Sequence, residues 1–436
     1  MNYIEIEKNI RIKLHEFRTY TPGDNVINIY AVVVYCLYKN FEVLKKSRER
    51  GSRATHDFFE AFFDQHEEKI SQQVKSSFEY SDLDKQINGL IDVMIEYYEH
   101  CSNASIFGRQ SFEQLQEWLD DNPAHVTQVT HTPRIINDLY HALIGDCSDM
   151  VLYDGVCGLG ALAFTLKPKK AILRDGNKFS TEPGKLLLEV VELDVDIKYE
   201  EVLYDSEPNP QADLVVCVPT FDTSYRSVVW HKVENPKYLL GSMRHKAVPT
   251  NASDSLWIQQ ALSQLNTVGK AYVLVNPGWL FRGGYDRELR EYLLEQDLIQ
   301  AVVHLPAGLL KTTRIETALL IINKAKKLDI GKVRLVDARD FGKRRRTVTK
   351  LERSAISKIE NLVNGNDDSL FGSQYCQILT LQQIKEKDYS LSYGEYAAAE
   401  IKVTKLSLEE ELLKLSNAQA DYEASQSAFN ELLNKI

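Results

Sequence analysis

Apolar residues in the first 120 positions recur every three to four residues, which is the spacing of helices with one buried face. The pattern is clearest in VINIYAVVVYCLYKNFEVLKKSRER, residues 26–50, and in DLDKQINGLIDVMIEYYEHCSN, residues 82–103. Few glycines interrupt it. The pattern predicts an all-helical N-terminal domain over residues 1–120.

From about residue 130 to 340 the pattern changes to short apolar runs separated by helical segments. Strands are predicted at MVLYD, KAILRD, YEEVLYD, DLVVCV, KAYVLVN, IQAVVHL and ETALLIINK. Helices such as PGKLLLEVVELD, SDSLWIQQALSQLN and YDRELREYLLEQ lie between some of them. This alternation favours an α/β domain over residues 121–345, with a doubly wound, mostly parallel sheet. Ligands of such sheets bind beyond the carboxyl ends of the strands.

The remaining residues divide into a mixed extension over 346–404 and a C-terminal helix over 405–436. The helix has apolar or amide residues in alternating steps of four and three, which is a heptad pattern and predicts a coiled coil. The positions are Leu408, Leu412, Leu415, Gln419, Tyr422, Gln426, Phe429, Leu433 and Ile436.

Composition narrows the class of protein. The chain has 436 residues, 44% of them hydrophobic and 26% charged, as in an ordinary water-soluble globular protein. The charged N-terminus and the absence of a long apolar run argue against a signal peptide or a membrane span and favour the cytoplasm. Six cysteines without a Cys-x-x-Cys pair argue against a metal site. Because the net charge is −10, a nucleic-acid surface requires a local basic patch.

The tips of the first three predicted strands carry candidate ligand-binding residues. Glycines follow MVLYD in DGVCGLG, where Gly158 and Gly160 permit a tight turn close to a ligand. Asp154 at the tip of this strand can bind an amino group. Asp175 ends the next strand and is placed to accept ribose hydroxyls, as in dinucleotide folds. Asp205 ends the third and can meet an adenine amino group. Together they indicate a nucleoside ligand. The alternatives are a plain turn for the glycines, a helix cap for Asp175 and an exposed loop carboxylate for Asp205.

Two basic segments are candidates for contact with nucleic-acid phosphates. GKRRRTVTK, on an expected loop, supplies Lys343, Arg344, Arg345, Arg346 and Lys350. Each such cation can neutralise one phosphate. Arg282 in LFRGGYDRELR is a further candidate. A solvated loop and a turn before a helix are the corresponding alternatives.

The fourth predicted strand runs into ADLVVCVPTFDTSY, residues 212–225, which resembles the Asn-Pro-Pro-Phe/Tyr loop of N6-adenine DNA methyltransferases. Most of residues 100–436 resemble one branch, the modification (M) subunits of type I restriction–modification systems. VTHTPRIINDLYHALI is similar to their Thr-Pro helix entry, and LYDGVCGLGALAF to their glycine motif. The most specific match is the segment from residue 269 to 323, with its Leu-Pro-x-Gly-Leu motif at LPAGL.

The resemblance implies a Rossmann-like, S-adenosylmethionine-dependent methyltransferase domain. It implies that Thr132 and Pro133 line the methyl-donor pocket, and that the loop of Val218, Pro219, Thr220 and Phe221 holds a flipped adenine. In the family an asparagine and the carbonyl of the first proline accept hydrogen bonds from the N6 amino group, and the aromatic residue stacks on the base. This chain has Val218 for the asparagine and Thr220 for the second proline.

The altered loop leaves three functions to weigh. In the first, a degenerate relative acts as a DNA-binding or assembly subunit. In the second, the chain still transfers methyl groups from S-adenosylmethionine to adenine N6 in DNA. In the third, it is an interaction scaffold without nucleic acid. The resemblance implies a bacterial or archaeal, nucleoid-associated protein whose terminal helix packs on a separate specificity subunit, with homodimerisation as the alternative.

Overall fold

The computed structural model describes the residues 3–17, 20–78, 83–122, 129–203, 209, 211–221, 253–310, 315–345, 348–366, 374–397 and 415–426. They fall into two units, 1–395 and 396–436. In the second unit, residues 415–426 form a helix with exposed side chains, which carries Leu415, Gln419, Tyr422 and Gln426 of the predicted heptads. Leu408, Leu412, Phe429, Leu433 and Ile436 lie outside the described residues. The coiled coil and the domain boundaries predicted above stay predictions.

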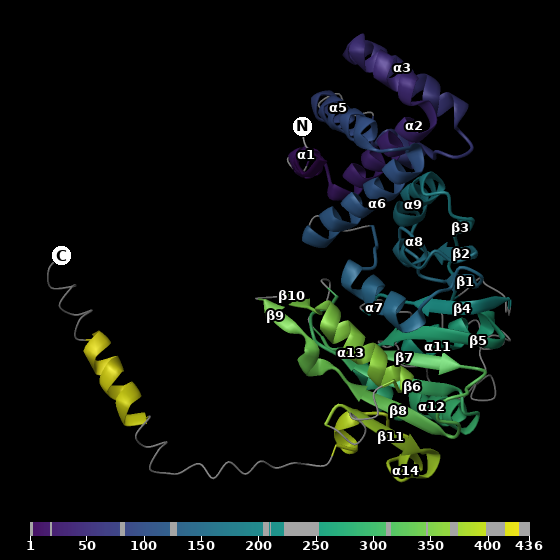
Figure 1. Ribbon diagram of the computed structural model, residues 1–436, viewed down its shortest axis with the longest axis vertical. Helices are drawn as coiled ribbons and strands as arrows, with labels where there is room; N and C mark the ends of the chain where they lie inside the picture. Colours follow the sequence, from purple (N-terminus) through teal and green to yellow (C-terminus); the bar gives the residue numbers. More distant parts are fainter. Residues whose placement is uncertain are drawn as a thin grey trace. The chain divides into compact units, whose positions relative to one another are not determined.

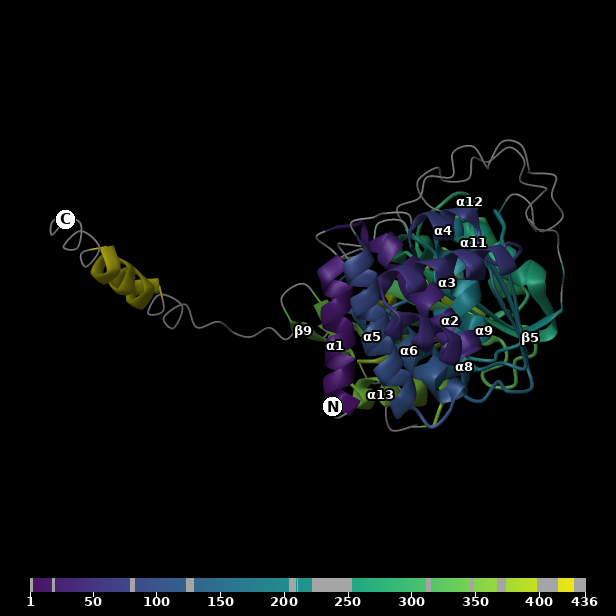
Figure 2. The same ribbon diagram turned by 90° about the horizontal axis from the view of Figure 1, so that it is seen from above.

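The first unit begins with a helical region, as the three-to-four spacing predicts. Its helices are α1 (Tyr3–Glu16), α2 (Gly23–Glu49), α3 (Ser52–Gln65), α4 (Gln72–Ser76), α5 (Asp84–His100) and α6 (Ala104–Asp121). Figure 2, seen from above, shows α1, α5, α6 and α2 side by side, in agreement with their contacts. By length and composition α2 could cross a membrane, but 67% of its most apolar stretch is buried inside the protein. That burial is what the central helix of a folded region requires.

A nine-stranded sheet follows the helical region, in the order β11-β8-β6-β7-β5-β4-β1-β2-β3. Figure 1 shows this order running away from the helical region, from β3 to β11. Seven strands are parallel to one another, and β7 and β11 run antiparallel to their neighbours. The strands are β1 (Val151–Asp154), β2 (Lys170–Asp175), β3 (Val195–Tyr199), β4 (Ala212–Cys217), β5 (Leu265–Val275), β6 (Ile299–Leu305), β7 (Thr317–Asn323), β8 (Lys332–Asp337) and β11 (Cys376–Thr380).

Helices cover the sheet, which confirms the doubly wound α/β class. Leu214 and Val216 of β4 belong to a core shared with α7 (Arg134–Ile144), α8 (Ala161–Leu166), α9 (Lys178–Val190) and α13 (Arg353–Asn364). Their neighbours in sequence, Val215 and Cys217, are buried outside that core, because alternate residues of a strand point to opposite faces. Helices α11 (Asp254–Gln264) and α12 (Tyr285–Glu295) pack against each other, and α11 lies on β4 and β5.

The third predicted strand, YEEVLYD, is wrong in position. The strand lies earlier, at β3 (Val195–Tyr199), and residues 202–203 form a turn. As the last strand of the sheet, β3 pairs on one side only and has no buried residue. A strand whose residues are partly exposed has a weak apolar signal. The more apolar Glu-Val-Leu of residues 201–203 therefore predicts the strand at the wrong place.

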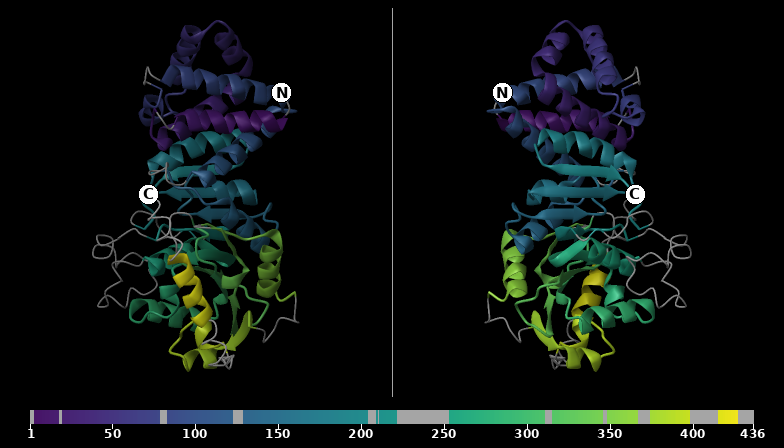
Figure 3. Two further views of the ribbon diagram at one scale, coloured as in Figure 1. Left: turned by 90° about the vertical axis from the view of Figure 1, so that its left-hand side faces the viewer. Right: turned by 90° about the vertical axis from the view of Figure 1, so that its right-hand side faces the viewer.

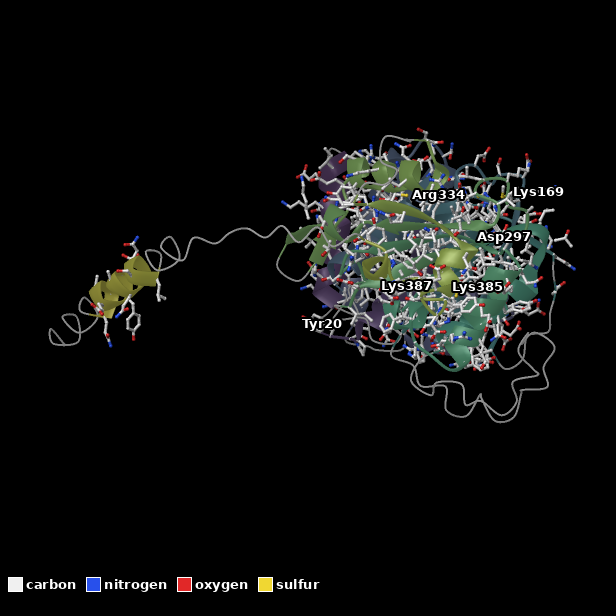
Figure 4. The ribbon with its side chains drawn as sticks, turned by 90° about the horizontal axis from the view of Figure 1, so that it is seen from below. Tyr20, Lys169, Asp297, Arg334, Lys385 and Lys387 are labelled. Atoms are coloured by element: carbon white, nitrogen blue, oxygen red, sulfur yellow. The ribbon has the colours of Figure 1, made fainter. Side chains whose placement is uncertain are left out.

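Ion pairs stabilise the part of the sheet that lies at the opposite end from β3. Arg334 of β8 is buried and pairs with Asp329, and Lys326 contacts Asp297 at 2.5 Å. Arg334 and Asp297 are labelled in Figure 4 together with Lys385 of α14 (Leu381–Lys385). Short 3₁₀ turns lie at Pro277–Leu280, Arg339–Phe341 and Tyr393–Glu395.

Candidate functional site

One edge of the sheet collects the candidate residues. Strands β1 to β6 and β8 all end there, because they are mutually parallel, and the antiparallel β7 begins there. Figure 3 shows the strands of this sheet lying one above another from two opposite sides. Neighbouring strand tips in this order are β3, β2, β1, β4 and β5. Residues that follow those strands are therefore brought together although they are far apart in sequence.

Two buried carboxyl groups brace the glycine turn after β1. Asp154 accepts the N–H of Val156 at 3.0 Å, and Asp175 accepts the N–H of Gly158 at 2.8 Å. Desolvation raises the pKa of Asp154 to about 8, opposed by the Val156 hydrogen bond and increased by the nearby Asp175 charge. Desolvation also raises the pKa of Asp175 to about 6. Such groups favour a ligand that brings hydrogen-bond donors or positive charge to them.

A loop before α7 forms a wall against this turn. Gly158 has a φ of +54°, and a Cβ on it would lie less than 3.0 Å from the carbonyl oxygen of Thr130. Thr132 is 7% exposed, its carbonyl accepts the side-chain N–H of Asn137 at 3.3 Å, and Pro133 is the residue from which α7 starts. Thus Thr132 and Pro133 adjoin the glycine turn through Thr130, although their proposed contact with a donor is untested.

The tip of β3 does not carry the predicted Asp205, which lies outside the described residues. Because β3 ends at Tyr199, the acids that follow it are Glu200 and Glu201. The Glu201 carboxyl lies within 3.0 Å of where a Cβ on Gly176 would stand, and its charge raises the pKa of Asp175. The signal in the sequence was the Glu-Glu pair itself, hidden by the misplaced strand.

The floor of the site is the segment that follows β4. Val218 and Phe221 are half-buried and pack against the main core, Pro219 is buried, and Thr220 is exposed. Just before them, the hydroxyl of Tyr140 donates to the carbonyl of Cys217 at 3.4 Å. Val218 therefore presents a hydrocarbon side chain at a strand tip next to the one that carries Asp154.

The segment after β5 is held by a network that sequence reasoning missed. Asp254 accepts the N–H of Asn276 at 2.8 Å, and its burial raises its pKa to about 6. Arg282, a predicted phosphate contact, donates to the buried Asp286 at 2.6 Å. The hydroxyl of Ser255 donates to the same carboxyl at 2.6 Å. The role of Arg282 toward nucleic acid is not tested by this pair, but its charge is already neutralised.

The basic run after β8 is a two-stranded hairpin rather than a loop. Strands β9 (Lys343–Arg345) and β10 (Val348–Lys350) pair antiparallel. Thr349 fixes the hairpin to the loop after β6, since its hydroxyl donates to the carbonyl of Ala307 at 2.6 Å and its N–H to that of Gly308 at 3.1 Å. The hairpin thus stands on the same edge of the sheet as the other candidate residues.

The cations of this hairpin differ in surroundings. Lys343 is exposed and pairs with Glu352 at 2.8 Å. Lys350 lines a groove of about 700 Å³ together with Leu309 and Pro133. The side chains of Arg344 and Arg345, and the whole of Arg346, are outside the described residues. In the described part of the chain, no cluster of three or more His, Cys, Asp or Glu side chains is arranged to hold a metal ion.

Comparisons with known proteins agree with this arrangement. Residues 185–404, half of the chain, match the family described as N-6 DNA Methylase. A curated relative, the type I restriction enzyme MjaVIII methylase subunit of Methanocaldococcus jannaschii, is 26% identical over 287 residues, which are 61% of this chain and 49% of that protein. The chain spans between 35% and 52% of the length of the curated relatives compared.

Solved structures share the fold. The methyltransferase subunit of a type I restriction-modification system from Streptococcus thermophilus superposes with a TM-score of 0.67 at 15% identity, covering 91% of this chain and all of that one (100%). A putative class I S-adenosylmethionine-dependent methyltransferase from Listeria monocytogenes gives a TM-score of 0.50 at 15% identity, covering 83% of this chain and 98% of that one. The predicted methyltransferase-type fold is therefore confirmed.

Proposed function

Because the chain belongs to the N-6 DNA Methylase family, we propose that it is a DNA-binding modification subunit of the type I kind in which methyl transfer to adenine N6 is impaired. The observation that carries the proposal is Val218, a half-buried hydrocarbon at the position where the family loop has its amide acceptor. The rest of the strand edge, with its glycine turn and acidic tips, is in place around it.

The residues at the tips of β1 to β3 fit S-adenosylmethionine. Asp154 has the chemistry to hold the donor's amino group and Asp175 the ribose hydroxyls. Glu201 supplies an acceptor for the adenine amino group in place of Asp205. Gly158 and Gly160 supply the positive φ values of the turn, and a Cβ on either would collide with Thr130 or Leu188. When bound, S-adenosylmethionine supplies the methyl group, and the residues named here bind and orient it.

The acceptor side of the reaction is where the chain is deficient. A base amino group that enters a buried pocket without a partner costs about 1–3 kcal/mol. Loss of one positioned polar contact in an active site lowers a rate by roughly 10²–10³-fold. Pro219 keeps its carbonyl and Phe221 keeps a face on which a base can stack, so we expect weak catalysis with base binding retained.

Active methylation is the second candidate. It is favoured by the intact glycine turn and by Asp254, a buried carboxyl beside the tip of β5, which neighbours β4. This carboxyl is an oxygen acceptor of the kind that Val218 cannot provide. If the chain methylates DNA, a D254A variant that kept full transfer activity would exclude Asp254 as the acceptor.

We propose two surfaces for the partners. The hairpin of Lys343 to Lys350 meets DNA phosphates at the edge that holds the base pocket. The terminal helix, with exposed Leu415 and Tyr422 seven residues apart, packs on a specificity subunit or on a second copy. Light scattering of the chain alone distinguishes the two possible partners of the helix, because pairing with a second copy doubles the mass. The proposed location is the bacterial or archaeal cytoplasm, at the nucleoid.

The proposal is tested by separating donor binding from transfer. Titration calorimetry with S-adenosylmethionine should give saturable heat in the unaltered chain, and a flat trace removes the donor site. The V218N/T220P double variant should raise tritium transfer to adenine-containing DNA about 10²-fold or more over the unaltered chain. V218L is the matched control, because it changes shape without adding an acceptor. Equal transfer by the unaltered chain and the double variant would contradict impairment through Val218.

A further inference from the structure

A buried hydrogen bond ties the wall of the proposed donor pocket to the helical region. The backbone N–H of Val129 donates to Oδ1 of Asp24 at 2.8 Å, although the two residues are 105 positions apart. Asp24 lies in the first turn of α2 and is 4% exposed. A buried carboxylate that accepts a backbone N–H fixes the position of that backbone strongly.

The next residue of the wall is tied to α9. The N–H of Thr130 donates to the Ser180 hydroxyl at 2.8 Å, and the two hydroxyls lie 3.0 Å apart. Ser180 is fully buried in the first turn of α9, three residues after Asn177, the residue from which that helix starts. Because the Thr130 carbonyl stands against Gly158, these two bonds set how closely the wall approaches the glycine turn.

The far half of α9 is in turn clasped by the helical region. Lys39 contacts Glu189 at 2.9 Å, and Tyr35 and Lys69 donate to the same carboxyl at 3.2 and 3.1 Å. The hydroxyl of Tyr38 donates to Glu192 at 2.9 Å. Figure 1 shows α2 and α6 next to α9, in agreement with their contacts. The helical region therefore holds the wall in two ways, directly through Asp24 and indirectly through α9, which α2 contacts.

We propose that Asp24 is a positioning residue for the methyl donor: through Val129 and Thr130, the helical region sets the wall of the donor pocket and thereby the affinity for S-adenosylmethionine. The inference rests on the proposed function in assigning that ligand. It adds that donor affinity and the docking of the helical region are coupled. By linkage, donor binding strengthens that docking by the same factor.

Asp24 variants test the coupling. D24A leaves the Val129 N–H buried without an acceptor and should weaken donor binding about tenfold in calorimetry. D24N keeps an oxygen acceptor and should bind the donor within about threefold of the unaltered chain, and a merely structural loss would not be rescued in this way. R48A is the matched control, because it breaks an ion pair of α2 with Asp92 of α5 and touches neither α9 nor the wall, and its donor affinity should be unchanged.

A second variant and a second measurement keep the inference open to refutation. S180A removes the other bond of the wall and, if D24A fails to fold, takes its place with the same expected weakening. Hydrogen exchange without donor should become faster at residues 129–133 and 156–160 in D24A or S180A, and stay unchanged in α11. A flat calorimetric trace of the unaltered chain with S-adenosylmethionine refutes only the proposed donor site. Unaltered donor affinity or unaltered exchange in the variants refutes the positioning role.

Discussion

The backbone N–H of Gly158 donates to the carboxylate of Asp175 across 2.8 Å, so the tip of β2 holds the turn that follows β1. The bond joins the two parts of the edge that the proposed donor needs, a bare backbone and an acidic group. It also means that Asp175 has a structural duty besides any contact with ribose. Variants of Asp175 therefore alter the turn as well as a ligand, and the neighbouring glycine is the cleaner probe.

Replacing Gly158 with alanine should destabilise the fold. The φ of +54° disfavours any side chain, and the new Cβ would meet the Thr130 carbonyl. Together these effects should lower the free energy of unfolding by about 2–4 kcal/mol in urea titrations. G283A is the control, since a Cβ on Gly283 has no neighbour within 4 Å. Its effect should stay within about 0.5 kcal/mol, and equal losses in both variants would contradict the close approach of the wall.

Relative to the unaltered chain, the D154N variant should become more stable to heat as the pH rises. The pKa of Asp154 is raised from its ordinary 3.8 to about 8, so between these values the folded state keeps a proton that the unfolded state has released. Stability of the unaltered chain is therefore lost progressively from about pH 4 to pH 8. Asparagine has no such proton and can still accept the N–H of Val156.

The difference in Tm between D154N and the unaltered chain should be near zero at pH 4 and reach about 2 °C or more at pH 8. Asp175, whose pKa is raised to about 6, titrates with the same sign in both proteins and cancels in the comparison. A difference in Tm that is constant over this range would show that Asp154 ionises normally.

Arg282 should matter to stability more than to DNA. R282A removes one partner of the buried Asp286 carboxyl and should lower the free energy of unfolding by about 1–3 kcal/mol. In R282A/D286N the loss should be smaller than the sum of the single losses, which a double-mutant cycle measures. Weaker DNA retention by R282A at unchanged stability would favour the phosphate contact instead.

The hairpin cations should set part of the salt dependence of DNA binding. Each phosphate contact contributes about 0.9 to the slope of log K against log salt, so K343A/K350A should flatten it by about 1.8. K385A is the control for lost charge, because Lys385 of α14 pairs with Glu295 of α12 at 2.7 Å, outside the hairpin. A slope unchanged in the double variant would place the DNA surface elsewhere.

Strand alternation predicted the class of the sheet because apolar runs buried on two sides stand out from the helices between them. The same rule failed at β3, whose exposed edge residues look like a loop. Asp154 and Asp175 were found as strand tips, whereas Glu201 was missed because one strand was misplaced by four residues or more. The hairpin of Lys343 to Lys350 was expected as a loop, since three-residue strands leave no period to detect.

Contacts between distant segments could not be predicted from the sequence. Nothing in the spacing of Asp24 or Ser180 indicates that they hold Val129 and Thr130. The pair of Arg282 and Asp286 is different, because it joins residues four apart and is a local contact. Tertiary packing decides the long-range pairs of Asp24 and Ser180, and a single sequence gives no signal for them.

The direction of β7 has a consequence for how such a chain can evolve. Because β7 begins at the edge where its neighbours β5 and β6 end, the segment before β7 lies at the same edge as the segments that follow β5 and β6. This edge is the first rim of the sheet, and the opposite edge is the second. Changes that abolish chemistry can accumulate on the first rim while the strands behind it stay packed. The impairment proposed for Val218 would be a change of this kind, since it alters a strand tip and leaves the strands behind it packed.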